Sequence, residues 1–156
     1  MGEASGKVAI KAPKEITDGF FTEGSDLSWD VVSNLFKFVG IDSLKDSHND
    51  LLYHEGRDFH LEGETESIGD FVMVTPFGSE WMGVCEALTK QGAGVEVYGV
   101  IFSEYGTSDY FILSDDTNYF ERVDWEVSKN TDRVEEIVMQ WKERVPKSLM
   151  PTFNKF

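Results

Sequence analysis

The three histidines of this chain lie close together in the sequence, among carboxylates. His48, His54 and His60 fall within thirteen residues. Imidazole and carboxylate groups together are what a divalent transition metal binds. The spacing, however, matches neither a His-x3-His pair on a helix nor a zinc finger, and Gly56 interrupts any single strand between His54 and His60. We therefore expect solvated loop histidines and predict no metal site, with these three residues as the positions to check.

Other patterns with chemical potential fail at decisive positions. The segment that begins at Asp46 is similar to the start of a calcium loop, but it has Leu51 where glycine is needed and Arg57 where a bidentate glutamate is needed. Gly92-Ala93-Gly94 precedes a predicted strand and opens no helix, which is the wrong context for a dinucleotide loop. Cys85 belongs to the apolar stripe of a predicted helix and is expected in the core. We predict no catalytic residue and no cofactor.

Charge is the feature that most restricts function. The chain has 156 residues and a formal net charge of −15. Residues 1–14 carry +2 and residues 142–156 carry +3, so the body between them carries −20. A body of this charge repels nucleic acids and anionic membranes and attracts basic partners from a distance. We therefore expect a basic protein partner, and neither direct nucleic-acid binding nor membrane binding.

The carboxylates concentrate in residues 41–70, where nine of them face only Lys45 and Arg57. A second acidic pair, Asp115-Asp116, follows an apolar run. These carboxylates are the predicted contact with the partner: Asp42, Asp46, Asp50, Glu55, Asp58, Glu62, Glu64, Glu66, Asp70, Asp115 and Asp116.

Three of these carboxylates alternate with other residues. If Glu62, Glu64 and Glu66 belong to an extended segment, they share one face with a spacing of about 6.5–7 Å. Such a row resembles a row of backbone phosphates. The alternative is an edge strand that its charges keep soluble and unpaired.

The element around which the rest is organised is a predicted three-strand antiparallel meander over residues 95–127. Val95, Val97 and Ile101 fall on one face of its first strand, and Tyr98 and Val100 on the other. Apolar residues on both faces indicate a strand covered on two sides. Turn residues follow at 106–109 and 115–118, so we place hairpin loops there.

Helical spacing of apolar residues predicts three helices. They lie over residues 31–39, where Gly40 ends the helix, over 79–91, and from 130 or 131 to 145 before Pro146. Further strands are expected at 7–12, 57–61 and 70–75, with Gly63 and Gly69 framing a turn. The fold class is α+β: a mixed or mainly antiparallel sheet of five to six strands with about three helices packed on it.

The chain length predicts a single domain, 1–156, with residues 1–6 and 147–156 as tails. One cysteine and the lack of an apolar leader favour a cytoplasmic location. The apolar residues of the C-terminal tail are expected to dock on the body; the alternative is that they join a homo-oligomer.

Two functional hypotheses follow. The first is a non-enzymatic acidic binding protein, and its strand–strand–helix ending and acidity resemble those of several bacterial immunity and antitoxin proteins. A nucleic-acid-mimicking inhibitor belongs to the same class. The alternative is a small-molecule-binding domain or small enzyme with a pocket between sheet and helices, lined by aromatic residues: Trp81, Tyr98, Phe102, Tyr110 and Trp125. The competing interpretation of these aromatic residues is that they fill the core.

Overall fold

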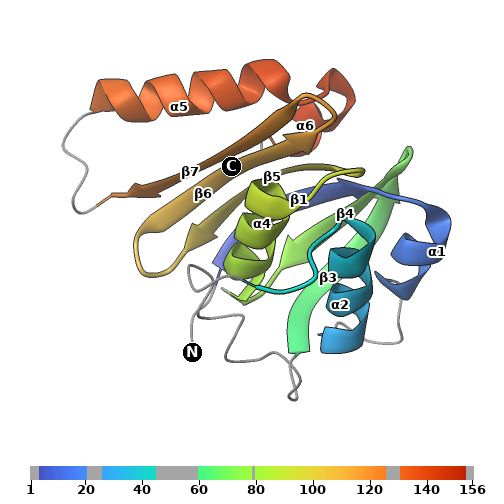
Figure 1. Ribbon diagram of the computed structural model, residues 1–156. Helices are drawn as coiled ribbons and strands as arrows, with labels where there is room; N and C mark the ends of the chain where they lie inside the picture. The colour runs from blue at the N-terminus through green and yellow to red at the C-terminus, as the bar shows by residue number, and fades with distance from the viewer. Residues whose placement is uncertain (1–3, 21–25, 45–59, 79, 126–130, 154–156) are drawn as a thin grey trace.

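A seven-stranded sheet forms the centre of the computed structural model, which describes residues 4–20, 26–44, 60–78, 80–125 and 131–153 (Figure 1). Every neighbouring pair of strands is antiparallel, in the order β2-β3-β4-β1-β5-β6-β7. The strands are β1 Ala4–Lys11, β2 Asp26–Ser28, β3 His60–Ile68, β4 Phe71–Pro76, β5 Glu96–Ser103, β6 Thr107–Ser114 and β7 Thr117–Asp124. The short β2 pairs only with the first residues of β3, so the other six strands form the main sheet.

Strand β1 lies at the centre of the sheet, between β4 and β5. Because both neighbours run antiparallel to β1, β4 and β5 run parallel to each other. The helix α4 (Glu80–Gln91) connects these two strands. The helix therefore connects two parallel strands, with β1 inserted between them, in a sheet whose neighbouring strands are all antiparallel.

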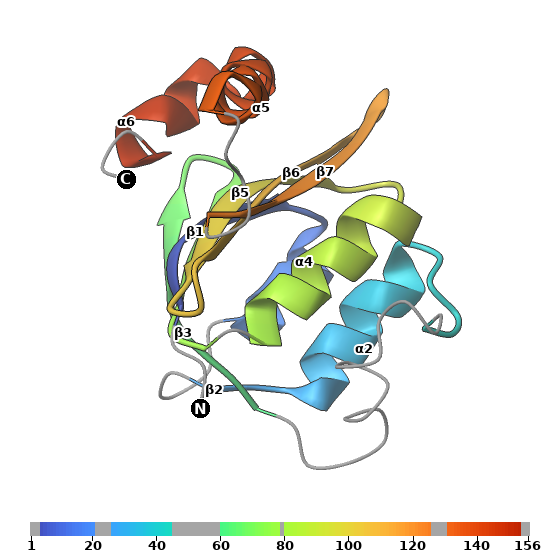
Figure 2. The same ribbon diagram turned by 90° about the vertical axis from the view of Figure 1, so that its left-hand side faces the viewer.

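Helices cover both faces of the sheet (Figure 2). On one side lie α1 (Lys14–Thr17), the 3-10 turn η1 (Asp18–Phe20), α2 (Trp29–Phe38) and α4. On the other side lie α5 (Thr131–Arg144), the 3-10 turn η3 (Lys147–Leu149) and α6 (Met150–Phe153). The sheet therefore has one hydrophobic core on each face.

Alternation along the central strands supplies both cores. Val97 and Ile101 pack in the core under α2 and α4, whereas Tyr98 and Val100 pack in the core under α5. The predicted meander and the predicted double covering of its first strand are thus confirmed. The apolar stripe of α5, with Val134, Ile137 and Trp141, is buried as its spacing indicated.

The α+β class and the mainly antiparallel sheet are confirmed, but the helix count exceeds three because α1 and α6 were not predicted. Both are four-residue helices, too short to show a 3.6-residue apolar period. Pro13 lies immediately before α1, and its carbonyl accepts hydrogen bonds from the N–H groups of Ile16 and Thr17 at 2.9 and 3.2 Å.

Two predicted boundaries are wrong. Gly63 lies inside β3, opposite Pro76, and not in a turn; only Gly69, with φ of +59°, lies in the β3–β4 turn. The predicted N-terminal tail is shorter than 1–6, because Ala4–Gly6 pair with Ile101–Ser103 of β5. This pairing uses backbone groups, so the weak side-chain pattern of the segment gave no sign of it.

The C-terminal segment packs on the body. Leu149 and Phe153 are buried in the same core as Trp141, and the ring centroids of Trp141 and Phe153 lie 5.0 Å apart. The described apolar side chains of this segment are therefore largely used within the chain.

Candidate functional site

The carboxylates Glu62, Glu64 and Glu66 form a row along β3, which we call the glutamate ladder. All three are exposed, and they alternate with the buried Gly63 and the half-buried Thr65. Successive ladder positions in an extended strand are about 6.5–7 Å apart. The segment is therefore extended, which is the condition under which these three side chains were expected to share a face.

Strand pairing shows on which side of the sheet the ladder lies. Glu66 is opposite Met73, and Met73 belongs to the core under α5 and α6. Glu64 is opposite Thr75, whose hydroxyl accepts a hydrogen bond from the Lys7 ammonium. Within the described ranges, the ladder carboxylates form no ion pair.

Two hydrogen bonds fix the backbone of Glu62, the first residue of the glutamate ladder. The carbonyl oxygen of Glu62 accepts hydrogen bonds from the backbone N–H of Phe77 at 2.9 Å and from the indole N–H of Trp81 at 3.1 Å. Trp81 is itself buried on α4. These two bonds fix the start of β3 against β4 and α4.

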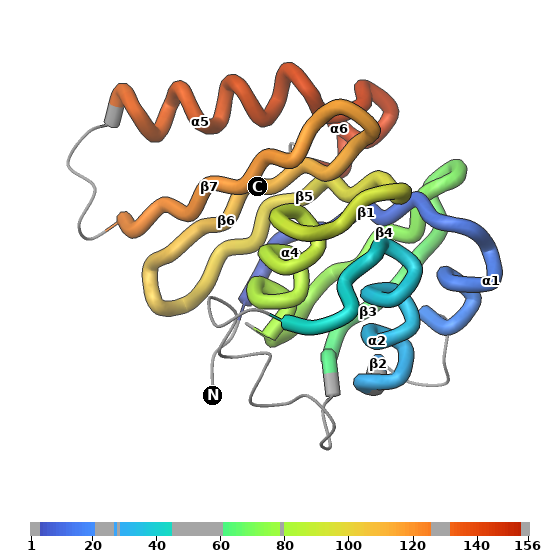
Figure 3. Tube along the Cα trace, in the orientation of Figure 1, coloured from blue at the N-terminus to red at the C-terminus, as the bar shows by residue number. Residues whose placement is uncertain are grey.

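Other predicted carboxylates lie in or next to turns at one end of the sheet; the β3–β4 and β6–β7 turns can be followed in Figure 3. Asp70 lies in the β3–β4 turn and Asp115 and Asp116 in the β6–β7 turn, and strand register places both turns at the same end. Asp42 is exposed just after α2, whose C-terminus reaches this end through the bond from Ala93 N–H to Val39 carbonyl at 3.1 Å.

One of these carboxylates has an evident structural role. The hydroxyls of Ser114 and Thr117 each donate to Asp116 Oδ1 at 3.0 Å. These bonds hold the pKa of Asp116 below its ordinary value, with the Ser114 bond as the largest cause. Asp116 therefore stabilises its turn and carries its charge down to lower pH than a free aspartate.

Part of the predicted site lies outside the described residues. This applies to Asp46, Asp50, Glu55, Asp58, His48 and His54, and to the side chain of His60. Among the residues that are described, no group of three or more His, Cys, Asp or Glu side chains is arranged to hold a metal ion. Nor does any described helix have the length and apolar character needed to cross a membrane.

The sequence did not reveal a buried ion network between α4 and the last two strands. Asp109 on β6 is fully buried and receives two bonds from Arg122 on β7, Nε–H to Oδ1 at 2.7 Å and Nη2–H to Oδ2 at 2.9 Å. Arg122 Nη2 also donates to Glu86 Oε1 at 2.9 Å, and Lys90 donates to Glu86 Oε2 at 2.8 Å. The aromatic ring of Phe120 lies beneath both cations, 4.9 Å from Lys90 Nζ and 5.5 Å from Arg122 Cζ.

The electrostatics of this network fit a structural role. Burial raises the pKa of Asp109, and the bonds and charge of Arg122 oppose that shift. Conversely, the bond to Asp109 is the largest cause that raises the pKa of Arg122. Both cations and both carboxylates are engaged within the network, so it offers a ligand no unsatisfied charge.

Cys85 lies on the same helix and is completely buried. Burial raises the pKa of its thiol well above the ordinary value, and the nearby charge of Asp109 raises it further. The thiolate form that a nucleophile requires is therefore suppressed. This agrees with the expectation of a core residue.

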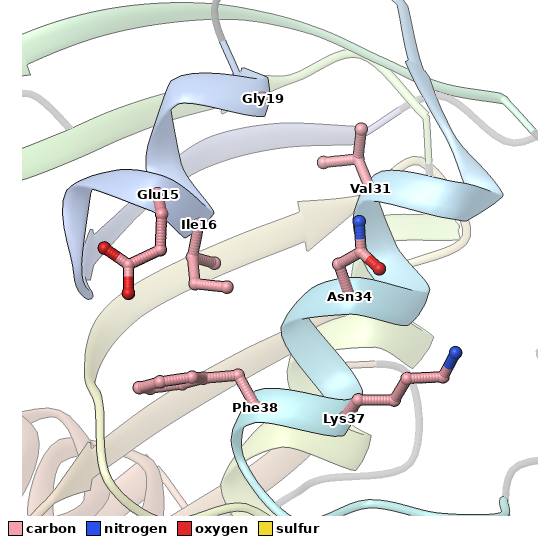
Figure 4. Close-up of a pocket in the computed structure, with 7 residues that line it drawn as sticks. All are labelled: Glu15, Ile16, Gly19, Val31, Asn34, Lys37 and Phe38. Carbon is pink, nitrogen blue, oxygen red and sulfur yellow. The ribbon is translucent and has the colours of Figure 1, made fainter.

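A surface hollow of about 430 Å³ lies between α1 and α2 (Figure 4). Ile16 and Val31 give it apolar walls and Phe38 closes its lower side, while Glu15 and Asn34 supply polar groups. None of the five aromatic residues proposed for a pocket lines this hollow. Trp81, Tyr98 and Tyr110 are buried, and Phe102 packs against the core of Tyr98 and Tyr110, while Trp125 is largely exposed.

The fold and site define a class: an acidic α+β protein with a helix-flanked antiparallel sheet and a row of exposed glutamates on one strand. The chain matches no protein-family model, no curated protein and no solved structure. Functional inference therefore rests on the geometry of this chain alone.

Proposed function

We propose that this protein is a non-enzymatic binding protein that captures a basic protein partner through the glutamate ladder. The observation that carries the proposal is the uninterrupted exposure of Glu62, Glu64 and Glu66 on one face of β3. The formal net charge of −15 adds long-range attraction for a basic partner and steers its approach.

The partner class follows from the spacing of the charges. A row of carboxylates at strand spacing imitates a row of phosphates, so the partner is a basic protein of the kind that binds nucleic acid, such as a toxin or nuclease. An immunity-like or inhibitory role fits this capture. A cytoplasmic location belongs to the same proposal and is supported by the single, buried Cys85.

The test compares two variants with the same change in net charge. The ladder variant is E62Q/E64Q/E66Q, and the control is D132N/E135Q/E143Q, which removes three exposed carboxylates from α5. The probe is a fluorescent ten-residue lysine peptide, and its affinity is measured by anisotropy at low and physiological salt.

Exposed ion pairs contribute about 0.5 kcal/mol each, so loss of three of them lowers affinity by about tenfold. We expect this loss in the ladder variant and a change below about twofold in the control. Equal losses in the two variants would mean that net charge alone drives binding, and affinity that does not change with salt would remove the proposal. The same variants then serve as baits, and a basic protein retained by the control but not by the ladder variant is the expected partner.

The hollow between α1 and α2 supports a second candidate function, small-molecule binding. Its volume of about 430 Å³ falls within the range of ligand sites, and its lining combines the apolar Ile16 and Val31 with the polar Glu15 and Asn34. A fragment library screened by NMR is expected to shift the methyl resonances of Ile16 and Val31, and Val31→Trp is expected to abolish the shift of the Ile16 methyls. If no fragment shifts these methyls, the candidate is dropped.

A further inference from the structure

One side of α2 exposes apolar side chains to water next to α1. Val31, Asn34 and Phe38 recur at spacings of three and four residues, so they lie on the same side of the helix. The core-facing residues of α2 form a separate stripe: Val32, Leu35 and Phe36. A surface helix normally has polar residues outside its core-facing stripe, yet the side chain of Phe38 is 42% exposed. The exposed part of this ring is available for contact with a ligand.

The exposed side of α2 and the short helix α1 together form the hollow of about 430 Å³. Ile16 of α1 and Val31 of α2 are partly buried and pack against the core, so the hollow has a supported apolar wall on each side. From residue 31 to residue 38 the helix rises about 10 Å, at about 1.5 Å per residue. A wall of this length suits a small molecule that carries one ring.

Two charged side chains line the hollow, and they extend in opposite directions. In Figure 4 the carboxylate of Glu15 and the ring of Phe38 both extend to the left, whereas the ammonium of Lys37 extends to the right, away from them. The ring is seen nearly edge-on, with one face toward the side on which Glu15 and Ile16 lie. Lys37 therefore contributes its methylene stem and keeps its charge in water. A ligand that contacts the Phe38 ring meets the charge of Glu15.

The polar groups of the hollow have no partner within the described part of the chain. Neither Glu15 nor Asn34 takes part there in a side-chain hydrogen bond or an ion pair. Lys14 precedes Glu15, but adjacent residues of a helix do not face each other. The amide of Asn34 offers both a donor and an acceptor. Both side chains can therefore bond a ligand without first breaking an internal contact.

From this arrangement we infer that the hollow binds a small organic amine with an apolar body, an inference that rests on the small-molecule candidate and is independent of the glutamate ladder. The ammonium group pairs with Glu15 and lies over the exposed face of Phe38. The apolar body packs on Ile16 and Val31 and removes their exposed surface from water. The net charge of −15 raises the concentration of small cations near the protein.

Ligands of other charge fit the same hollow less well. An organic acid of the same shape would place a second carboxylate near Glu15, while the ammonium of Lys37 extends away from the Phe38 ring. A neutral molecule makes the apolar contacts but leaves the carboxylate of Glu15 without a cation. The charge of the ligand therefore decides its affinity more than its shape does.

The test compares three probes of similar shape: phenethylamine, phenethyl alcohol and hydrocinnamate. Each is titrated at pH 7, and NMR follows the methyl resonances of Ile16 and Val31. The two site variants are Glu15→Gln, which removes the charge, and Phe38→Leu, which keeps an apolar side chain but removes the ring. Glu135→Gln is the matched control, because it removes one exposed carboxylate from α5, on the other face of the sheet.

We expect the amine to bind about four- to twentyfold more tightly than the alcohol, because the ion pair and the cation–π contact each contribute about two- to fivefold. Hydrocinnamate should bind more weakly than the alcohol. Glu15→Gln and Phe38→Leu should each reduce the preference for the amine by about two- to fivefold, and Glu135→Gln should preserve it.

Equal affinity for the amine and the alcohol, or tighter binding of hydrocinnamate, would overturn the amine assignment and leave the small-molecule candidate standing. Failure of all three probes and of the fragment library to shift the methyls would overturn both. Methyl shifts that depend on protein concentration without any probe would show that a second copy covers the hollow, and would also overturn the assignment.

The lysine peptide used for the glutamate ladder separates this site from the proposed capture of a basic protein. Glu15→Gln should change the affinity for that peptide by less than about twofold, since the variant leaves the ladder intact. A larger loss would show that the hollow belongs to the surface that binds the basic partner, and would overturn its assignment to a small amine.

Discussion

Replacement of Arg122 by methionine tests whether the buried ion network is a structural element of this fold. The substitution keeps a long apolar stem and removes the guanidinium that bonds Asp109 and Glu86. Glu86 retains Lys90 at 2.8 Å, but Asp109 loses both of its hydrogen bonds from Arg122. The main consequence is a fully buried carboxylate that has lost its cation.

The magnitude follows from the burial of the two partners. Removal of one partner from a buried pair costs about 3–5 kcal/mol. The Asp109 side chain is 0% exposed but the Arg122 side chain is 43% exposed, so water enters more easily when arginine is removed. We therefore expect Arg122→Met to lower the free energy of unfolding by about 2–3 kcal/mol at pH 7.

The cost should depend on pH in a defined direction. Burial raises the pKa of Asp109 above its ordinary value of 3.8, and Arg122 opposes that rise. Without Arg122 the folded-state pKa rises further, while the unfolded value stays the same. The folded variant then binds the proton more tightly than the unfolded chain does, so its stability falls as pH increases from the unfolded pKa through the folded one. The destabilisation by Arg122→Met is therefore small near pH 4 and largest above the folded pKa.

Urea denaturation at pH 4 and pH 7 measures both quantities. Asp109→Asn combined with Arg122→Met should be less destabilised than Arg122→Met alone, because it buries no charge. Arg133→Met is the control, since Arg133 pairs with the more exposed Glu121 and Glu136 at 3.2 and 3.3 Å and should cost less than about 1 kcal/mol. Two results would refute the explanation that an unpaired buried carboxylate causes the destabilisation. One is an equal loss of unfolding free energy for Arg122→Met at both pH values, and the other is no gain in stability when Asp109→Asn is added.

Two further predictions concern the core. Gly99→Ala should lower the free energy of unfolding, measured by urea denaturation, by about 1–3 kcal/mol. The reason is that the added Cβ would lie 2.5 Å from Phe111 Cζ and 2.8 Å from the Lys7 carbonyl oxygen. Gly19→Ala is the control and should be nearly neutral, because its Cβ would lie 3.6 Å from the Val31 methyls; equal effects of the two substitutions would contradict this packing argument. Cys85, buried and with its thiol pKa raised, should resist a chromogenic disulfide reagent in the native protein and react fully in denaturant; rapid reaction of the native protein would show that α4 opens readily.

The sequence predicted the elements whose pattern is local. The stripe of Val134, Ile137 and Trp141 repeats over several turns, and β5 alternates two apolar faces, so α5 and the meander could be recognised. The shared face of the ladder followed from alternation only on the condition that residues 62–66 are extended, which β3 meets. Which side of the sheet the ladder occupies could not be predicted, because it depends on the pairing of β3 with β4.

The residues that were misread are those whose environment is set by distant partners. The run Gly106-Thr107-Ser108-Asp109 has the composition of a turn, yet Asp109 is buried in β6. Arg122, thirteen residues away, donates the two hydrogen bonds that make that burial tolerable. Gly63 was read as part of a turn for a similar reason, since its place in β3 depends on pairing with Pro76.

The buried network and the exposed ladder together explain how the chain tolerates its charge. Asp109 and Glu86 inside the network are balanced by Arg122 and Lys90, so the network contributes no net charge. The excess of −15 must therefore lie outside it, where water and salt screen the self-repulsion that would otherwise destabilise the fold. The same screening weakens attraction for a basic partner. In the proposed function, the charges of the acidic surface remain in water until a basic partner replaces that water with cations.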